Sequence, residues 1–440
     1  MKQAIRGAML SFRSDPYIDG VARAMVYHPD AIVRMADGKI VEAGPADILL
    51  PKLAPDEPLT RYEKSLIMPG FIDCHVHYPQ MQVIASYGVK LLDWLNTYTF
   101  PVEQMFSDKE HARQVARFYL NENFRNGITS ASVFCTIFPQ SVDALFEEAE
   151  QYGMRLMAGK VLMDRNAPPG LLDTPQSAYD DSKALIGRWH GKGRFEYVIT
   201  PRFAPTSSPE QLEMAGALAA ENPDMLIQSH ISEDVSEVAL IRELFPGVAN
   251  YADVYMKYGL LRPRAIYGHG IYMSEEELQL FHDTGSSIAH CPTSNMFLGS
   301  GCFRLRETEY DLRRPVRTGL ATDLGGGTSF SMLQTMSEAY KVSQLNRFPV
   351  SGPHAFYWAT RGTARALHLD DRVGALEPGM EADVIVLDLH STPLIDYRMQ
   401  YCESIDDVLF TQMTLADDRA IRATYVSGKS VYDRQAAGKR

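Results

Sequence analysis

Two histidines separated by one residue give the strongest chemical signal in this chain of 440 residues. His75 and His77 lie at the end of an apolar run that begins at Gly70. Because alternate residues of a β-strand point to the same face, both imidazoles are expected to project from one side of the strand end. Two such imidazoles make half of a zinc site, although two structural histidines would give the same pattern.

Three further strand ends carry residue types that bind metal ions. Separate apolar runs end in His230, His269 and Asp323. Barrel enzymes place their catalytic groups at the carboxyl ends of strands, and ligand types at four such ends are hard to attribute to chance. Imidazoles and one carboxylate suit zinc, which keeps one position open and lowers the pKa of a bound water to about 7. The spacing alone leaves iron and manganese as alternatives.

Acid–base roles are expected for three residues of this set. Glu233 follows His230 by three residues, where a carboxylate can carry a proton from nucleophile to leaving group. Its alternative role is an acidic residue in the first turn of a helix. Asp323 is expected to act both as a weak ligand and as the base for the water. His269 is either a fifth ligand or a hydrogen-bond partner of the hydroxide, and we favour the second because catalytic zinc takes few protein ligands.

Alternative metal sites would depend on two other residues, His290 and Lys160. His290 ends the next apolar run and is followed at once by Cys291-Pro292, so we interpret it as structural or as a support for the site. A two-metal site needs a bridging ligand, commonly a modified lysine, and Lys160 lies within a strand pattern. Because Lys160 precedes the expected strand end at Asp164 by several residues, we favour a single metal ion.

Eight apolar runs that alternate with helical patterns are expected to position these side chains. The expected strands are Gly70–His75, Thr129–Cys135, Met154–Met163, Phe195–Pro201, Met225–His230, Ala265–His269, Ser287–His290 and Gly319–Asp323. The expected helices include Asp108–Arg125, Gln140–Tyr152, Pro209–Glu221 and Ser274–Thr284. The last of them opens with a capping box formed by Ser274 and Glu277. This alternation predicts an α/β fold, a (β/α)8 TIM barrel.

Short strand patterns occupy both ends of the chain. They are Ala4–Phe12, Ala31–Met35 and Lys39–Ala43 near the start, and Asp383–Leu389, Ala423–Val426 and Lys429–Tyr432 after a final helix near His354–Leu367. Neither end can build a core alone. We therefore expect residues 1–67 and 377–440 to form one β-sandwich accessory domain, with the catalytic barrel of residues 68–376 inserted between them.

Composition narrows the class of protein. A formal net charge of -12 disfavours a nucleic-acid partner, because phosphate binding needs a basic face. The five cysteines are irregularly spaced, which argues against a disulfide framework. Residues 1–20 lack the apolar core of a signal peptide, and no stretch approaches 18 consecutive apolar residues. We expect a cytoplasmic protein that does not span a membrane.

Together these residues resemble the amidohydrolase superfamily, in its branch with a single metal ion. The stretch Pro69-Gly70-Phe71-Ile72-Asp73 before the two histidines is typical of that superfamily, as is the stretch from Gly374 to Asp383. The resemblance covers nearly the whole chain. It supports one zinc ion per subunit, held by His75, His77, His230 and Asp323.

Five stretches are similar to the guanine deaminases of that superfamily. They are HYPQ at 77–80, TPRF at 200–203, SHISE at 229–233, IAHCPTSN at 288–295 and TDLGGG at 322–327. By this resemblance Gln80 and Arg202 recognise the purine and Phe203 orients it. Without the resemblance we would interpret them as a surface glutamine, a salt-bridged arginine and a core phenylalanine. Ala204-Pro205-Thr206 and Gly268 depart from the expected pattern, which has a more polar stretch and an alanine.

The resemblance implies hydrolytic deamination of guanine to xanthine and ammonia, in purine catabolism, by a homodimer. Hydroxide would attack C2 while Glu233 protonates N3, and His77, His230, Glu233 and Asp323 would line the substrate pocket. A same-fold deaminase or chlorohydrolase for another purine, a pyrimidine or a triazine is the nearest alternative. A non-catalytic barrel scaffold is a remote one, because such a protein is expected to lose the ligands. The second deaminase architecture is excluded, since the chain has no PCxxC zinc signature.

Overall fold

Eight parallel strands form the barrel that carries the predicted site residues. The structure is a computed structural model that describes residues 2–88 and 91–437. The barrel strands, in chain order, are β5 (Phe71–His77), β6 (Ile128–Phe134), β7 (Arg155–Gly159), β9 (Phe195–Pro201), β10 (Leu226–Ile231), β11 (Ala265–His269), β12 (Ser287–His290) and β13 (Thr318–Leu320). Each pairs in parallel with its neighbour, and the two-residue β8 (Val161–Leu162) pairs with β9. The predicted TIM barrel is confirmed.

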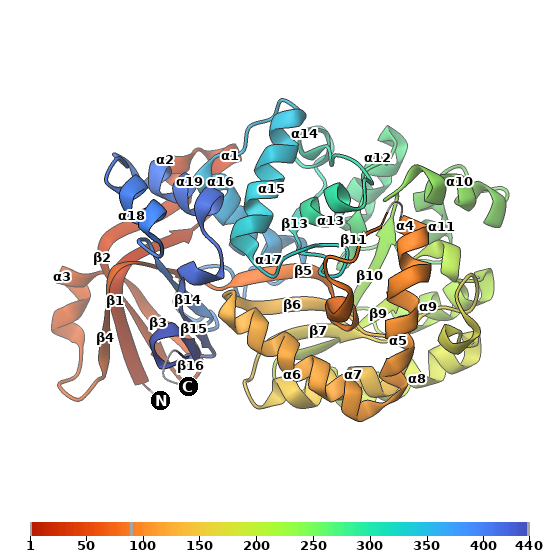
Figure 1. Ribbon diagram of the computed structural model, residues 1–440, viewed down its shortest axis with the longest axis horizontal. Coiled ribbons are helices and arrows are strands. Elements are labelled where there is room, and N and C mark those ends of the chain that lie inside the picture. The colour runs from red at the N-terminus through yellow and green to blue at the C-terminus, as the bar shows by residue number, and fades with distance from the viewer. Residues whose placement is uncertain (1, 89–90, 438–440) are drawn as a thin grey trace.

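Helices follow the strands and surround the barrel (Figure 1). They are α6 (Lys109–Arg125), α7 (Pro139–Glu150), α8 (Pro175–Trp189), α9 (Pro209–Glu221), α10 (Val235–Leu244), α11 (Tyr251–Lys257), α12 (Glu275–Thr284), α13 (Pro292–Phe297), α14 (Leu305–Thr308) and α15 (Met332–Leu345). The predicted capping box at α12 is present, with Ser274 as N-cap and Glu277 as its partner. The final predicted helix is divided into α16 (Gly352–Tyr357) and α17 (Thr363–Ala366) by a π-helical turn.

The sequence located the barrel strands well and their ends less well. Three predicted strands, at residues 195–201, 265–269 and 287–290, have the observed bounds. Lys160 separates β7 from β8 where one longer strand was expected. The last strand ends at Leu320, so Asp323 lies three residues beyond it rather than at its end. The position of Asp323 is therefore set by the loop after β13 and not by the geometry of the strand.

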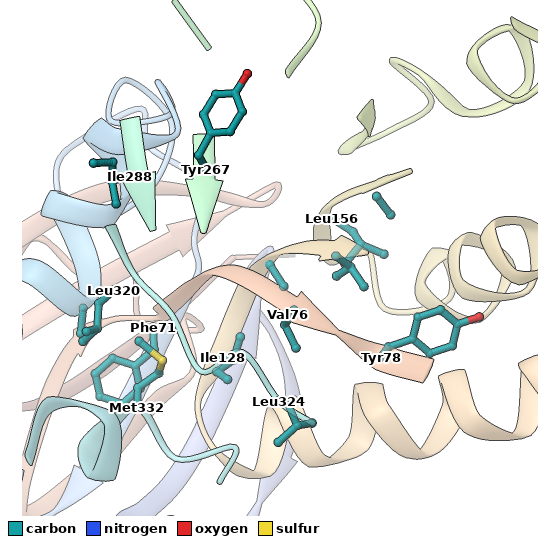
Figure 2. Close-up of a cluster of buried hydrophobic side chains, with 14 of the residues drawn as sticks. Phe71, Val76, Tyr78, Ile128, Leu156, Tyr267, Ile288, Leu320, Leu324 and Met332 are labelled. Carbon is teal, nitrogen blue, oxygen red and sulfur yellow. The ribbon is translucent and has the colours of Figure 1, made fainter. Parts of the chain in front are cut away.

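Two buried clusters hold the barrel together. Larger side chains pack beneath the surrounding helices, among them Phe71, Val76, Ile128, Leu156 and Met332 (Figure 2). A second cluster contains side chains drawn from most of the strands, such as those at positions 72, 157, 198, 266 and 289. Strands buried on both faces read as nearly continuous apolar runs, which explains why they were recognisable in the sequence.

Both ends of the chain contribute to a separate seven-stranded sheet. Its strand order is β16 (Lys429–Asp433), β15 (Ile421–Val426), β14 (Val384–Asp388), β4 (Leu59–Pro69), β1 (Lys2–Phe12), β2 (Met25–Ala36) and β3 (Lys39–Pro45). The unpredicted β4 joins the two halves, since it pairs with β1 in parallel and with β14 in antiparallel. Residues from both halves share one core, in which the Tyr62 and Tyr425 hydroxyls lie 2.6 Å apart.

The remaining helices lie outside the barrel series. They are the short α1 (Pro16–Asp19), α2 (Val21–Ala24) and α3 (Ala46–Leu49), α4 (Leu91–Trp94) and α5 (Phe100–Glu103) after β5, and α18 (Pro393–Met399), α19 (Ile405–Leu415) and α20 (Arg434–Ala437) near the end. The expected domain limits at residues 67 and 377 stay a prediction, and Met1 and residues 438–440 lie outside the described residues. Within residues 2–88 and 91–437, no helix is both long and apolar enough to cross a membrane.

Candidate active site

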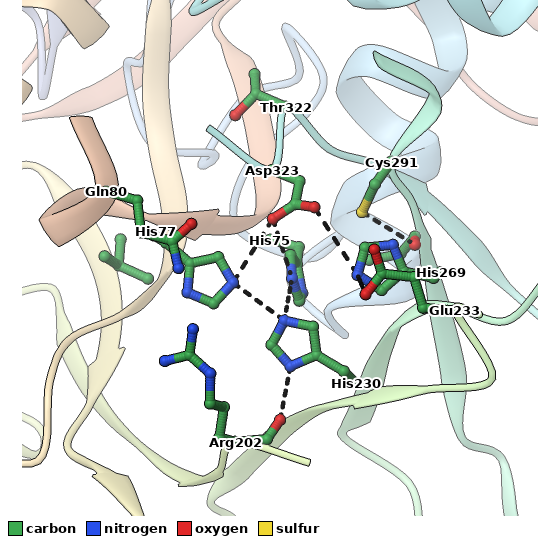
Figure 3. A network of polar contacts seen from close by, with 12 residues as sticks. His75, His77, Gln80, Arg202, His230, Glu233, His269, Cys291, Thr322 and Asp323 are labelled. Carbon is green, nitrogen blue, oxygen red and sulfur yellow. Dashed lines mark hydrogen bonds and ion pairs between the residues drawn. The ribbon is translucent and has the colours of Figure 1, made fainter. Parts of the chain in front are cut away.

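Four histidines and two carboxylates meet at the carboxyl-terminal mouth of the barrel (Figure 3). His75 and His77 come from β5, His230 from β10 and His269 from the end of β11. All four imidazoles are buried, as are Glu233 and Asp323. The fold thus brings together residues from four separated stretches of the chain, all of which the sequence had singled out.

Three imidazole nitrogens converge on one point. The Nε2 atom of His230 lies 3.2 Å from that of His75 and 3.0 Å from that of His77. Oδ1 of Asp323 lies 3.5 Å and 3.6 Å from the same two nitrogens. A tetrahedral zinc ion with bonds of about 2.0–2.1 Å sets its ligands about 3.3 Å apart. Lone pairs that face one another at these distances need a cation or a proton between them, so the donor set fits a metal ion.

The protonation states of these imidazoles also suit metal binding. Nδ1 of His230 donates to the carbonyl oxygen of Arg202 at 2.6 Å, which leaves the Nε2 lone pair pointing at the centre. Burial lowers the pKa of His75, His77 and His230 well below the usual value. Neutral imidazole is the form that binds metals. The protein therefore presents three ligands that need no deprotonation.

A buried aspartate fixes the loop that carries Asp323. The carboxylate of Asp73 accepts hydrogen bonds from the Thr322 amide at 3.0 Å and hydroxyl at 2.5 Å, and from the His75 amide at 3.3 Å. The Asp323 amide in turn donates to the His75 carbonyl at 3.0 Å. Burial raises the pKa of Asp73 to about 7. These bonds join the first strand of the barrel to the loop beyond the last.

The backbone at the site is strained. His269 and Asp323 adopt left-handed conformations, with φ of +76° and +46°, and Ser232 does so at +51°. Such conformations in residues other than glycine cost about 1–3 kcal/mol each and persist where the surroundings enforce them. Here the strain directs two polar side chains into the barrel mouth, which is consistent with a functional site.

A second polar group lies beside the ligand set. Oε2 of Glu233 is 3.3 Å from Nε2 of His269, and Ser300 donates to Oε1 at 3.3 Å. Burial, followed by the charges of Asp323 and Glu237, raises the pKa of Glu233 well above its usual value. Nδ1 of His269 lies 2.8 Å from the amide oxygen of Asn295, to which it donates. Nε2 of a neutral His269 is then an acceptor that faces Glu233 and the metal ligands.

An open pocket of about 410 Å³ leads to this centre. It is lined by the site histidines and acids and by apolar side chains, namely Leu91, Trp94, Leu95, Phe203 and Leu298. Gln80, Arg202 and Phe203 all line it, as the sequence led us to expect.

Sequence analysis missed one charged residue at the site, Glu103. This glutamate ends α5 and is buried, with 1% of its surface exposed. Nη1 of Arg202 donates to both of its oxygens at 2.9 Å, and Nε2 of Gln80 donates to Oε1 at 3.2 Å. The available signal was an acid among Phe100, Val102 and Phe106, which did not identify its partners.

Residues assigned to alternative sites lie elsewhere or have other partners. His290 stacks on Phe303 and Trp358, with ring centroids 4.6 Å and 5.4 Å away, and so has a packing role. Lys160 is buried and forms an ion pair with Asp173. The Cys291 thiol belongs to a group with His75, His269 and Asp323 that has metal-ligand spacing. Burial raises the pKa of that thiol well above its usual value, which disfavours the thiolate that metals bind.

The two departures from the expected motifs have structural consequences. A Cβ atom at Gly268 would lie 2.5 Å from Cε1 of His75, so the observed ring position requires glycine there. Ala204-Pro205-Thr206 forms a 3-10 turn outside the pocket. The Ala204 amide donates to the Tyr255 hydroxyl, which donates to the His230 carbonyl. This turn therefore supports a ligand strand and does not contact the substrate pocket.

Comparisons with known proteins agree with the geometry. Residues 66–431 match the model of the Amidohydrolase family. The chain is 45% identical to guanine deaminase of Escherichia coli over 98% of both chains, and 35% identical to that of Homo sapiens over 83% of this chain and 82% of the human one. The solved structure of the E. coli enzyme covers 98% of this chain, and this chain covers all of that one, with a TM-score of 0.96. An adenosine deaminase from Xanthomonas campestris, with bound zinc, shares the fold at 22% identity over 98% of this chain and 93% of that one, with a TM-score of 0.85.

Proposed function

Since this chain belongs to the amidohydrolase family, and within it to the guanine deaminases, we propose that it hydrolyses guanine to xanthine and ammonia. The family predicted from the sequence motifs is confirmed. One observation carries the proposal: a single pocket joins a metal-ligand set to the side chains of Gln80, Arg202 and Phe203. Water and guanine can therefore meet in one pocket.

We propose that His75, His77, His230 and Asp323 hold one zinc ion. The convergence of three Nε2 atoms and a carboxylate supports this set, and the adenosine deaminase neighbour with bound zinc supports the identity of the ion. The metal, when bound, would act as a Lewis acid that lowers the pKa of water to about 7. The ion pair of Lys160 with Asp173 disfavours the two-metal alternative.

Proton transfer is assigned to the two carboxylates. Burial raises the pKa of Asp323, which makes its carboxylate a stronger base for the proton of the attacking water. Glu233, whose pKa is raised well above its usual value by burial, protonates N3 as water attacks C2. The Glu233 carboxylate can then pass the proton that Asp323 took from water to the C2 amine, and it regains a proton from the C2 hydroxyl as the carbonyl of xanthine forms. The amine departs as ammonia, so that guanine and water give xanthine and ammonia.

His269 positions the nucleophile in this scheme. Because its Nδ1 proton is engaged with Asn295, its Nε2 lone pair can accept a hydrogen bond from the attacking water. Nε2 lies 3.8 Å from Oδ2 of Asp323 and 3.3 Å from Oε2 of Glu233, so the water would lie between acid and base. We assign His269 the hydrogen-bonding role and not that of a fifth ligand, because a catalytic zinc ion takes few protein ligands.

Substrate recognition is assigned to Gln80, Arg202 and Phe203, which line the pocket. The Arg202 guanidinium can donate to the O6 and N7 acceptors of guanine, a pairing that arginine forms readily with that base. The Gln80 amide can both donate and accept, and the Phe203 ring offers a flat apolar surface. Arg202 and Phe203 are buried, and a ring bound between them would lose its water shell.

Ammonia release from zinc-loaded protein tests the assignment, with guanine, adenine, cytosine and a triazine offered in parallel. Release from guanine alone is the expected result. Release from another of these compounds would keep the hydrolytic chemistry and overturn the substrate. No release from any of them by protein with bound zinc would favour the scaffold alternative.

Two properties expected from the sequence stay predictions. A homodimer follows only from the resemblance to the family, and light scattering of the purified protein would test it. A cytoplasmic location is consistent with the five free cysteines, and fractionation of cells that express the protein would test it.

A further inference from the structure

We propose that Glu103 is a positioning residue that determines specificity. It fixes which hydrogen-bond donors and acceptors Gln80 and Arg202 present to the purine. It would act through Arg202 and Gln80, without touching the substrate. The inference rests on the proposed function, because it assigns a role within guanine recognition.

Glu103 has only two acceptor oxygens, and both are used by pocket side chains. Nη1 of Arg202 lies 2.9 Å from each oxygen, and Nε2 of Gln80 lies 3.2 Å from Oε1. A carboxylate accepts hydrogen bonds and donates none, so the Gln80 amide must turn its nitrogen toward Glu103. With the amide reversed, two oxygens would face each other in a buried site, which is unfavourable.

The opposite side of Gln80 is shaped to receive its amide oxygen. A Cβ atom at Gly325 would lie 2.3 Å from Oε1 of Gln80, and the φ of +123° at Gly325 also favours glycine. Oε1 therefore occupies space that any other residue at position 325 would fill. Glu103 on one side and Gly325 on the other hold the amide in a single orientation, with its oxygen available as an acceptor in the pocket.

Arg202 is held in the same way. Among the described residues, hydrogen bonds from its guanidinium involve Nη1 and Glu103, and the Phe100 ring lies 5.5 Å from its Cζ. Its other N–H groups are left for the pocket that it lines. Glu103 also balances the buried positive charge of Arg202.

The donors and acceptors that Arg202 and Gln80 present match guanine and do not match adenine. Guanine presents an acceptor at O6 beside a donor at N1, which pair with an arginine donor and a glutamine oxygen. Adenine presents a donor at N6 beside an acceptor at N1, so it would meet like groups at both positions. A free glutamine could reverse its amide to suit either base. The hydrogen bond from Gln80 to Glu103 prevents this reversal.

Two substrates with the same leaving amine separate this role from a structural one. 2-Aminopurine carries the C2 amine of guanine but lacks O6 and the N1 proton. For the wild-type enzyme loaded with zinc, we expect kcat/KM to favour guanine by about 10⁴, as for sites built around a substrate hydrogen bond. In Glu103→Gln the orientations of the Gln80 amide and the Arg202 guanidinium are no longer fixed. Its kcat/KM for guanine should fall at least about tenfold, mainly through KM, and for 2-aminopurine less than about threefold.

Glu148→Gln is the matched control. Glu148 is also a buried glutamate with paired hydrogen bonds from one arginine, at 3.2 Å and 3.1 Å from Arg117, but it lies on α7 away from the pocket. We expect Glu148→Gln to leave kcat/KM unchanged for both guanine and 2-aminopurine. If Glu103→Gln does not fold, Glu103→Asp keeps the charge and shortens the reach, and it should lower kcat/KM for guanine more than for 2-aminopurine.

The outcomes are distinct. A reduced ratio with unchanged zinc content supports the inference. Equal loss on both substrates, or an unchanged ratio in a folded variant, would show a merely structural role and overturn it. Absence of guanine deamination by the wild-type enzyme would overturn the proposed function, and this inference with it.

Discussion

Replacing Glu233 by glutamine tests the proton-transfer scheme most directly. Glutamine keeps the size of the side chain and the hydrogen bond from Ser300, but it cannot give or take a proton. Glu233 lies outside the proposed ligand set, so zinc content should stay the same. General acid–base groups contribute about 10²–10⁴ in rate, so we expect kcat to fall by that factor with little change in KM.

The same substitution has a thermodynamic signature in metal-free protein. The unfolded chain ionises Glu233 near the ordinary pKa of about 4.3, whereas the folded protein holds that proton to higher pH. Between these pKa values the folded state binds more protons. The free energy of unfolding therefore decreases as pH rises, by at most about 1.4 kcal/mol per pH unit for this group. Glutamine abolishes this contribution, so Glu233→Gln should gain stability over the wild type above pH ~5.

Steady-state ammonia release, elemental zinc analysis and urea unfolding at several pH values measure these effects. Glu277→Gln is the control, since Glu277 is a buried capping-box glutamate on α12 that does not line the pocket. It should keep full activity, and because burial raises the pKa of Glu277 as well, it is a control for the activity measurement alone. Full activity in Glu233→Gln would refute the scheme. An unchanged pH dependence of unfolding would refute the raised pKa.

Three further predictions follow from the same geometry. Asn295→Ala removes the acceptor that sets the His269 tautomer, so kcat should fall about tenfold with zinc content unchanged, and a kcat equal to that of the wild type would argue against this role. Removing the metal with a chelator should abolish ammonia release and lower the melting temperature, and added zinc should restore both; activity that survives complete chelation would exclude a metal-dependent reaction. Arg155→Ala breaks a buried pair in which Arg155 donates to Glu381 at 2.5 Å and 2.7 Å, so urea unfolding should show a loss of about 3 kcal/mol, with kcat unchanged at low temperature.

The parts of the fold that the sequence predicted are those whose signal is local. Barrel strands such as β9 and β11 are buried on both faces, so their apolar runs end where the strands end. The strand β4 was missed because its first half, from Leu59 to Lys64, is largely exposed and polar, and only its last residues are apolar. Its place between β1 and β14 depends on partners from both ends of the chain, which no local pattern specifies.

The site was predictable to the extent that barrel topology concentrates strand ends. His75, His77, His230 and His269 could be grouped without coordinates, because parallel strands in a barrel deliver their carboxyl ends to one mouth. Glu103 could not be grouped with them. It ends a short helix, and its role depends on hydrogen bonds to residues 23 and 99 positions away in the chain.

Arg202 shows why metal binding and substrate recognition are linked in this fold. Its carbonyl oxygen accepts the proton of His230 Nδ1, which sets the orientation of a proposed ligand. Its guanidinium, on the same residue, pairs with Glu103 and lines the pocket. The first task uses the backbone and does not depend on the side-chain type, whereas the second depends on it entirely. Within this fold the side chains that recognise the purine can therefore be changed without loss of the metal site, as long as the backbone at residue 202 stays in place.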